Sequence, residues 1–119
     1  MYFDFDACRF QDLESDHDAW AVIAHDRSLT WRQLETQARA WCEQAQALGL
    51  HANAPVVIRG HKEAAFMVAL TGALMLRAPF IPVDAVYPQS RLQSIIDTLD
   101  ANLLYDAATG SFQVLREGP

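Results

Sequence analysis

Closely spaced carboxylates are the first candidates for acid-base chemistry in this sequence. The carboxylates form three close pairs, and paired acids can share general acid/base work when burial separates their pKa values. All three pairs fall in polar stretches without apolar enclosure, so we interpret them as solvated surface: Asp4/Asp6, Asp16/Asp18 and Asp97/Asp100.

The cysteines and histidines are likewise predicted to be structural or incidental. Cys8 and Cys42 lack the close spacing and the His/Asp companions of a metal site, and a cytosolic chain would keep both thiols reduced. No two histidines stand four residues apart, and each lies in a predicted loop or element end: His17, His25, His51 and His61. We therefore assign no metal ligand and no nucleophile.

One turn has the composition of an anion-binding site. His61-Lys62-Glu63 precedes a predicted helix, whose free N–H groups would favour negative charge together with Lys62. A plain helix entrance is the favoured interpretation. The glycines never fall into G-x-G-x-x-G or G-x-x-x-x-G-K-[ST] spacing, and no G-x-S-x-G elbow is present. No catalytic, cofactor-binding or metal residue is predicted in this chain.

The elements that would position any site begin with a hairpin and a helix. Residues 21–24 and 29–30 flank a polar four-residue turn typical of β-hairpins, whereas residues 9–13 favour a short helix. Thr30 and Gln33 have capping-box spacing at the start of a longer helix that Gly49 ends. Its predicted buried face repeats at steps of four and three: Leu34, Ala38, Trp41, Ala45 and Leu48.

Strands and helices alternate after this point. Residues 55–59, 80–83 and 102–105 are predicted strands, with Pro82 placing the second at an edge or a strand end, and residues 111–115 could add another. The helix over residues 64–76 is apolar almost all round and should be sandwiched. Pro88 suits the first turn of a third helix, whose predicted buried face is Leu92, Ile95, Ile96 and Leu99. The alternation predicts a single α/β domain over residues 1–119, with a largely parallel sheet and flanking helices.

Composition excludes several classes of protein. The 119 residues are 51% hydrophobic and 20% charged, as in ordinary globular domains. A net charge of -6 without a basic cluster argues against nucleic acid as a partner. The acidic N-terminus does not resemble a signal peptide, and residues 64–76 are too short to span a bilayer. We expect a cytoplasmic chain with no membrane insertion.

Two segments carry a family resemblance. Residues 29–34, LTWRQL, are similar to L-[TS]-Y-x-E-L, and residues 74–84, LMLRAPFIPVD, are similar to L-K-A-G-x-A-Y-[IVL]-P-[LIV]-D. Residues 87–92, YPQSRL, follow in register. Together they resemble the opening motifs of the AMP-forming adenylating superfamily. The chain departs from the pattern at Met75, Leu76 and Arg77, which replace Lys-Ala-Gly, and at Pro79, so the local backbone of this turn is expected to differ.

Within that superfamily, residues 57–63 (VIRGHKE) and 81–84 (IPVD) resemble the D-alanine:D-alanyl carrier protein ligase branch, alongside the adenylation domains of nonribosomal peptide synthetases. The resemblance implies an enzyme that uses ATP and Mg²⁺ to form an aminoacyl-adenylate and then loads a carrier protein. The family's phosphate loop, adenine motif, ribose-binding Asp and catalytic Lys all follow the stretch that is matched here. The chain is thus expected to be an N-terminal fragment of a larger adenylation domain, inactive alone.

Two alternatives remain open from the sequence. The chain could be a free-standing noncatalytic α/β module for protein interaction or regulation, or, less well supported, a small receiver-like domain. The fragment hypothesis also predicts self-association through surface that the remainder of the ligase would cover. The helix over residues 64–76 and the strand over residues 80–83 are the expected contact elements, whereas the hairpin around Asp26 is expected to be polar enough for a monomer.

Overall fold

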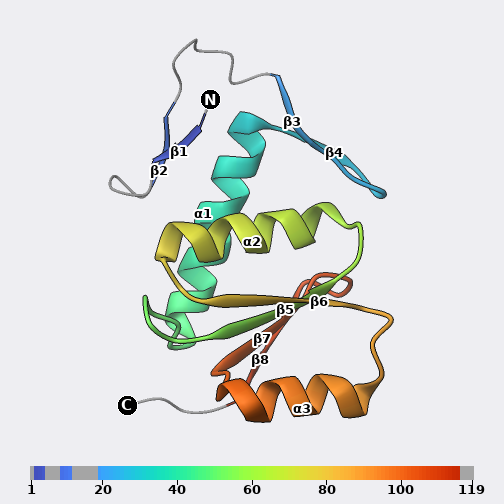
Figure 1. The fold of residues 1–119 in the computed structure, drawn as a ribbon. Helices are drawn as coiled ribbons and strands as arrows, with labels where there is room; N and C mark the ends of the chain where they lie inside the picture. The colour runs from blue at the N-terminus through green and yellow to red at the C-terminus, as the bar shows by residue number, and fades with distance from the viewer. Residues whose placement is uncertain (1, 5–8, 12–18, 116–119) are drawn as a thin grey trace.

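A four-stranded sheet forms the centre of the protein (Figure 1). In this computed structural model, which describes residues 2–4, 9–11 and 19–115, the sheet contains β5 (Val56–Gly60), β6 (Phe80–Asp84), β7 (Leu103–Asp106) and β8 (Ser111–Val114). The strand order is β6-β5-β7-β8. β5 pairs in parallel with β6 and β7, and β8 runs antiparallel to β7. The predicted α/β fold with a largely parallel sheet is confirmed.

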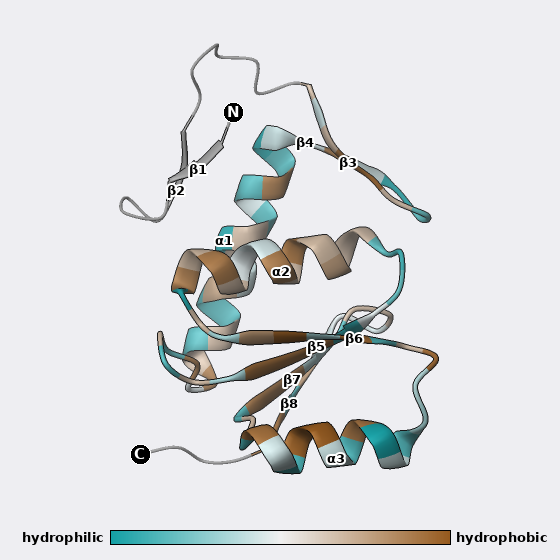
Figure 2. Cartoon of the chain, viewed as in Figure 1, coloured by the Kyte–Doolittle hydropathy of each residue, from teal (hydrophilic) through white to brown (hydrophobic). Residues whose placement is uncertain are grey.

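Helices cover both faces of this sheet. α1 (Trp31–Ala47) and α2 (Ala64–Leu76) lie on one side and α3 (Gln89–Leu99) on the other (Figure 1). Successive side chains of β5 point to opposite faces, as the pleat requires: Val56 and Ile58 join the core under α1 and α2, and Val57 joins the core over α3. Apolar residues accordingly run through β5, β6 and β7, while α3 alternates between apolar and polar colours (Figure 2).

The predicted start of α1 is confirmed, but its predicted buried face is one residue too long. Thr30 Oγ1 accepts a hydrogen bond from Gln33 N, and Gln33 Oε1 accepts one from Thr30 N, which completes the capping box. Four of the five predicted core residues are buried: Leu34, Ala38, Trp41 and Ala45. Leu48 is 42% exposed because it is the C-cap, where the helix ends before Gly49 takes a φ of 102°.

α2 packs against both α1 and the sheet, as its apolar composition predicts. Gly72 lies against Trp41, and a Cβ atom built on Gly72 would come 2.5 Å from Trp41 Cε3. The helix ends at Arg77, which has φ 58° and ψ 27°. This left-handed conformation is one that glycine adopts without steric cost. Arg77 thus occupies, at the glycine position of the family motif, a conformation that suits glycine.

Two details of β6 and α3 refine the predictions. β6 is an edge strand, as Pro82 predicts, and Pro82 is exposed. Pro88 is the N-cap of α3 and not a residue of its first turn. Leu92 and Ile96 are buried and Ile95 is half-buried, but Leu99 is 41% exposed, so the prediction that Leu99 is buried is wrong. Leu99 is the last helical residue before Asp100 turns the chain at φ 53°.

The N-terminal part contains two antiparallel strand pairs. β3 (Trp20–Ile23) and β4 (Ser28–Thr30) form the predicted hairpin. β1 (Tyr2–Asp4) pairs with β2 (Arg9–Gln11), so the short helix predicted to begin at Arg9 is wrong over these three residues, and its remainder lies outside the described ranges. Within the described ranges, no helix has both the length and the apolar character that a membrane span requires.

Candidate functional site

The carboxyl ends of β5, β6 and β7 lie together at one edge of the sheet. β5 continues into α2 on one face and β6 into α3 on the other, so the connections diverge between these two neighbours. In open α/β sheets, ligands bind outside the carboxyl ends of the strands. The residues that follow β5 and β6 are therefore the first place to look for a site.

Backbone and side-chain contacts close this edge of the sheet. Ala85 N donates to Gly60 O at 2.9 Å, and Arg59 Nη2 donates to Ala85 O at 3.0 Å. Arg59 Nη1 also lies 3.6 Å from Asp106 Oδ2 at the end of β7. Arg59 thus ties the turn after β6 to the end of β7, a role that the sequence does not indicate because both partners are distant in the chain.

His61 and Asp84 form the most suggestive pair at this edge. His61 Nδ1 lies 3.5 Å from Asp84 Oδ1, which also accepts a hydrogen bond from Val86 N at 3.0 Å. Both side chains are about half exposed, at 51% and 42%, and the residues lining the surface beside His61 include no Ser, Thr or Cys. We interpret the pair as a surface contact that holds the turn after β6.

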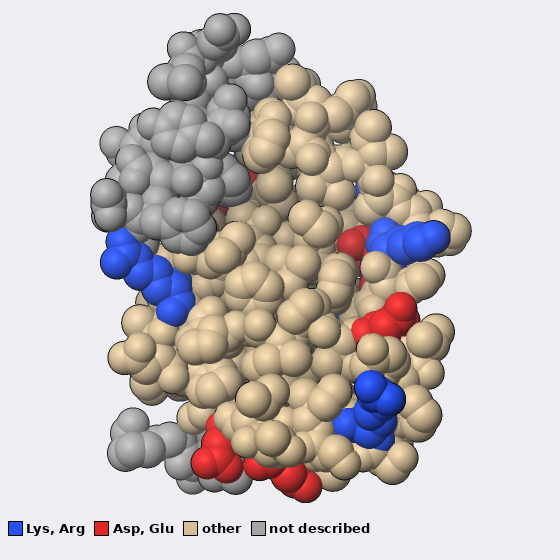
Figure 3. Space-filling model, in the orientation of Figure 1, with Lys and Arg blue, Asp and Glu red and all other residues tan. Residues whose placement is uncertain are grey.

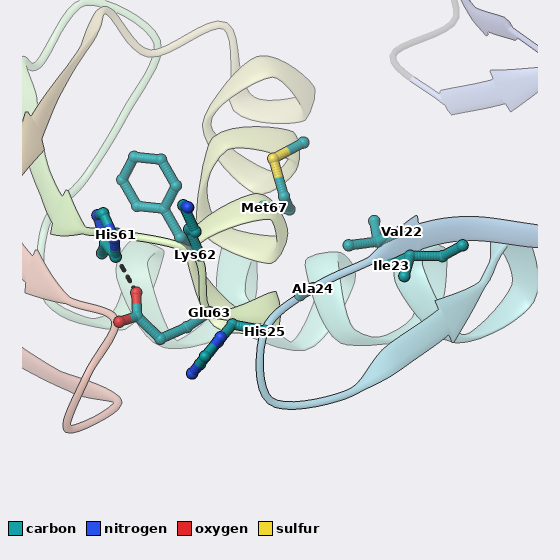
Figure 4. Close-up of a pocket in the computed structure, with 9 residues that line it drawn as sticks. Val22, Ile23, Ala24, His25, His61, Lys62, Glu63 and Met67 are labelled. Carbon is teal, nitrogen blue, oxygen red and sulfur yellow. Dashed lines mark hydrogen bonds between the residues drawn. The ribbon is translucent and has the colours of Figure 1, made fainter.

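A groove opens beside this edge, between the β3–β4 hairpin and the start of α2 (Figure 4). We call it the hairpin groove; its volume is about 500 Å³. Apolar side chains from β3 and α2 meet polar ones from the turn after β5, and this lining consists of Val22, Ile23, Ala24, His25, His61, Lys62, Glu63, Phe66 and Met67. Ile23 is 79% exposed, so the hairpin is less polar than predicted.

The predicted anion-binding turn is occupied by the protein's own carboxylates. Ala64 N, at the start of α2, donates to Asp26 Oδ1 at 2.9 Å. His61 N donates to Glu63 Oε1 at 2.7 Å, the contact drawn in Figure 4. The bond from the Ala64 amide holds the pKa of Asp26 below its ordinary value. These contacts support the interpretation of a plain helix entrance.

The remaining histidines and carboxylate pairs were predicted to lie on the surface, and those that the structure describes do so. His25, His51 and His61 are exposed, as are Asp97 and Asp100. His17, Cys8, Asp6 and the Asp16/Asp18 pair lie outside the described residues, as does the side chain of Asp4. In the described part of the chain, no three His, Cys, Asp or Glu side chains come together as metal ligands.

Cys42 is buried and poorly suited to nucleophilic chemistry. Its Sγ donates to Gly72 O at 3.2 Å, and burial raises the pKa of the thiol to about 11. On the face seen in Figure 3, the Lys and Arg side chains are scattered and form no basic stripe. The described residues thus include a partly apolar groove between the β3–β4 hairpin and α2.

Comparison with known proteins identifies the relatives of this chain. The model of the AMP-binding enzyme family matches residues 10–117. The AMB antimetabolite synthetase AmbB of Pseudomonas aeruginosa is 32% identical over 75% of this chain and 7% of its own length. Nonribosomal peptide synthetase 5 of Gibberella zeae is 32% identical over 78% of this chain and 1% of its own. The chain thus spans a small fraction of the curated relatives that it matches.

A solved structure agrees with these sequence relatives. The crystal structure of CmiS6 superposes with a TM-score of 0.72 and 34% identity over 89% of this chain and 27% of that one. The family match extends over most of the chain and includes both motif segments, from residue 29 to residue 92. The resemblance drawn from these motifs is confirmed: the chain belongs to the AMP-binding enzyme family.

Proposed function

We propose that this chain is a portion of an ATP-dependent ligase that activates an amino acid as its adenylate and loads it onto a carrier protein. The observation that carries this proposal is the family match over residues 10–117, together with sequence relatives that include a nonribosomal peptide synthetase. D-Alanine is the proposed amino acid, because residues 57–63 and 81–84 resemble the D-alanine:D-alanyl carrier protein ligase branch. We place the enzyme in the cytoplasm.

The proposed role of this portion is structural. ATP and Mg²⁺, which the family implies, find no matching set of groups here: Asp84 and Asp106 accept backbone hydrogen bonds from their own turns, from Val86 N and Ala108 N. The described residues also contain no cluster of three metal-ligand side chains. We therefore propose that no reaction step takes place on this portion and that the remainder of the ligase binds the nucleotide.

The test compares the chain with the complete product of its reading frame. A frame that continues past Pro119 into a Ser/Thr/Gly-rich loop supports the ligase, and a stop codon there supports the noncatalytic module instead. The complete product should catalyse ATP–pyrophosphate exchange that depends on D-alanine. Exchange that depends on another amino acid would retain the ligase and reject D-alanine, and no exchange with any amino acid would reject the proposed activity.

A further inference from the structure

α2 begins without a cap from its own sequence. Its N-cap residue, Glu63, makes no side-chain capping hydrogen bond. The first amide of the helix, Ala64 N, instead donates to Asp26 Oδ1 from the β3–β4 turn, 38 residues earlier in the chain. We propose that Asp26 acts as a tertiary cap of α2 and fastens the β3–β4 hairpin to that helix as a detachable strap.

A second hydrogen bond joins the same two segments. His25 N donates to Lys62 O at 2.9 Å, one residue before Asp26 on one side and two residues before Ala64 on the other. The two bonds run in opposite directions, one from the hairpin to the loop and one from the helix to the hairpin. Together they fix the tip of the hairpin at the entrance of α2.

The hairpin depends on such attachment. β3 and β4 form a two-stranded sheet, and an isolated pair of this kind is marginally stable in water. Val22 and Leu29 are buried against the core, but Trp20 and Ile23 are 61% and 79% exposed. The strands therefore contribute one apolar side to the core, and the turn is held by the two polar bonds.

The strap forms one wall of the hairpin groove. Val22 to His25 line it from the hairpin, and the loop and first turn of α2 line it from the other side (Figure 4). Release of the Asp26 and His25 bonds would let the tip of the hairpin move away from the entrance of α2, while the sheet stays intact. The groove is thus a place where the protein can open locally without unfolding.

Electrostatic attraction favours the state in which the hairpin is bonded to the start of α2. A carboxylate at a helix N-terminus interacts favourably with the free N–H groups and the helix dipole. The pKa of Asp26 is lowered chiefly by the Ala64 amide, with Arg27 acting in the same direction. The charge on Asp26 therefore strengthens the bond between strap and helix.

Amide hydrogen exchange on the full chain tests this inference. In Asp26→Ala, the amides of Ala64 and His25 should exchange at least about tenfold faster than in the unmutated chain, since a charge-assisted bond is lost. Amides of β5 should keep their rates, because the sheet stays closed. Asp26→Asn retains an acceptor oxygen without the charge and should give a smaller increase.

Asp97→Ala is the matched control, since it removes an exposed carboxylate whose hydrogen-bond partner, Gln93, lies on its own helix. It should leave the Ala64 and His25 rates unchanged. Three results would overturn the strap: an Ala64 amide unprotected in the unmutated chain, no acceleration in Asp26→Ala, or equal acceleration of the β5 amides. Equal acceleration in Asp97→Ala would also overturn it.

Discussion

Trp41 joins α1, α2 and the sheet through its ring. It packs edge-on against Tyr105 with centroids 5.8 Å apart, lies 5.5 Å from the Phe112 ring, and touches Gly72 closely. Only 4% of its surface is exposed. Trp41→Ala should therefore lower the free energy of unfolding by about 3 to 5 kcal/mol in urea denaturation.

Leu48→Ala is the control for this prediction. Sequence periodicity places Leu48 on the same face as Trp41, but the structure leaves it 42% exposed. We expect its truncation to cost less than about 1 kcal/mol. A loss below about 1 kcal/mol for Trp41→Ala would show that the ring is not a core contact.

Cys42 makes the folded protein less stable as the pH rises into the alkaline range. Folding raises the pKa of the thiol from 9.0 to about 11, so above pH 9.0 the unfolded chain releases a proton that the folded chain keeps. The stabilisation is present below pH 9.0 and is lost as pH rises toward 11, by up to about 3 kcal/mol.

Urea midpoints measured across this range for the unmutated chain and Cys42→Ala isolate the effect. Tyr105 also has a raised pKa, because its hydroxyl is desolvated, and both chains share that contribution. The difference in stability between the two chains should shrink above pH 9.0. A constant difference would show that the thiol ionises equally well in the folded state.

The residue types predicted much of this local chemistry. The loop positions of His25, His51 and His61 could be predicted from the sequence, and the structure leaves all three side chains exposed. Asp26 could not be assigned, since its partner is an amide 38 residues away and any polar turn residue would have the same local signature. The role of Arg59 could not be predicted either, because its partners, Ala85 and Asp106, are distant in the chain.

At the scale of elements, the C-terminus of α2 contains a conformational mismatch. Arg77 adopts a φ of 58°, where a Cβ atom is disfavoured. Comparing two substitutions at this position removes the arginine's own contacts from the comparison. Arg77→Gly should be more stable than Arg77→Ala by about 1 kcal/mol in thermal or urea unfolding, because the left-handed cost exceeds the entropy that glycine gains when unfolded. Equal stabilities would show that the turn is not strained.

Element interiors were predictable, and element ends were less so. The capping box at Thr30 and the apolar composition of α2 specify their helices through local physics. The burial of the last helical turns was overestimated at Leu48 and Leu99. The apolar periodicity of the sequence continues past the point where the helices contact the rest of the protein. The β1–β2 pair was missed because strand pairing is a nonlocal property that a three-residue segment does not encode.

At the scale of the whole molecule, we expect the chain to self-associate. The sequence placed the contact surface on α2 and β6, but α2 is largely covered, and large exposed apolar side chains occur on β3 and the adjoining turn of α2: Trp20, Ile23 and Met67. Light scattering at tens of micromolar should detect a dimer or larger species, since exposed apolar patches and sheet edges favour association.

Ile23→Lys should weaken this association more than Val86→Lys. Both side chains are similarly exposed, at 79% and 75%, but Val86 lies in the turn after β6 and does not line the hairpin groove. A strictly monomeric unmutated chain without a dye-binding apolar patch would contradict the prediction. It would favour the self-contained module.

The sequence predicted the architecture and the family well, because both rest on motifs spread over the chain. The hairpin groove could not be predicted, since it arises where the β3–β4 hairpin meets the start of α2. The candidate anion-binding turn, residues 61–63, lines this groove, but its sequence does not indicate the hairpin as a partner. The closure of the sheet's carboxyl edge also depends on the contact between Arg59 and Ala85, which only the folded chain displays.

We propose that this chain supplies scaffold and no catalytic group to an adenylating ligase. The decisive measurement is ATP–pyrophosphate exchange with D-alanine, with the complete product of the reading frame as the positive control. We predict exchange by the complete product and none above a no-protein blank for residues 1–119. Exchange by residues 1–119 alone would contradict the claim, because it would require nucleotide-binding and catalytic groups within the chain.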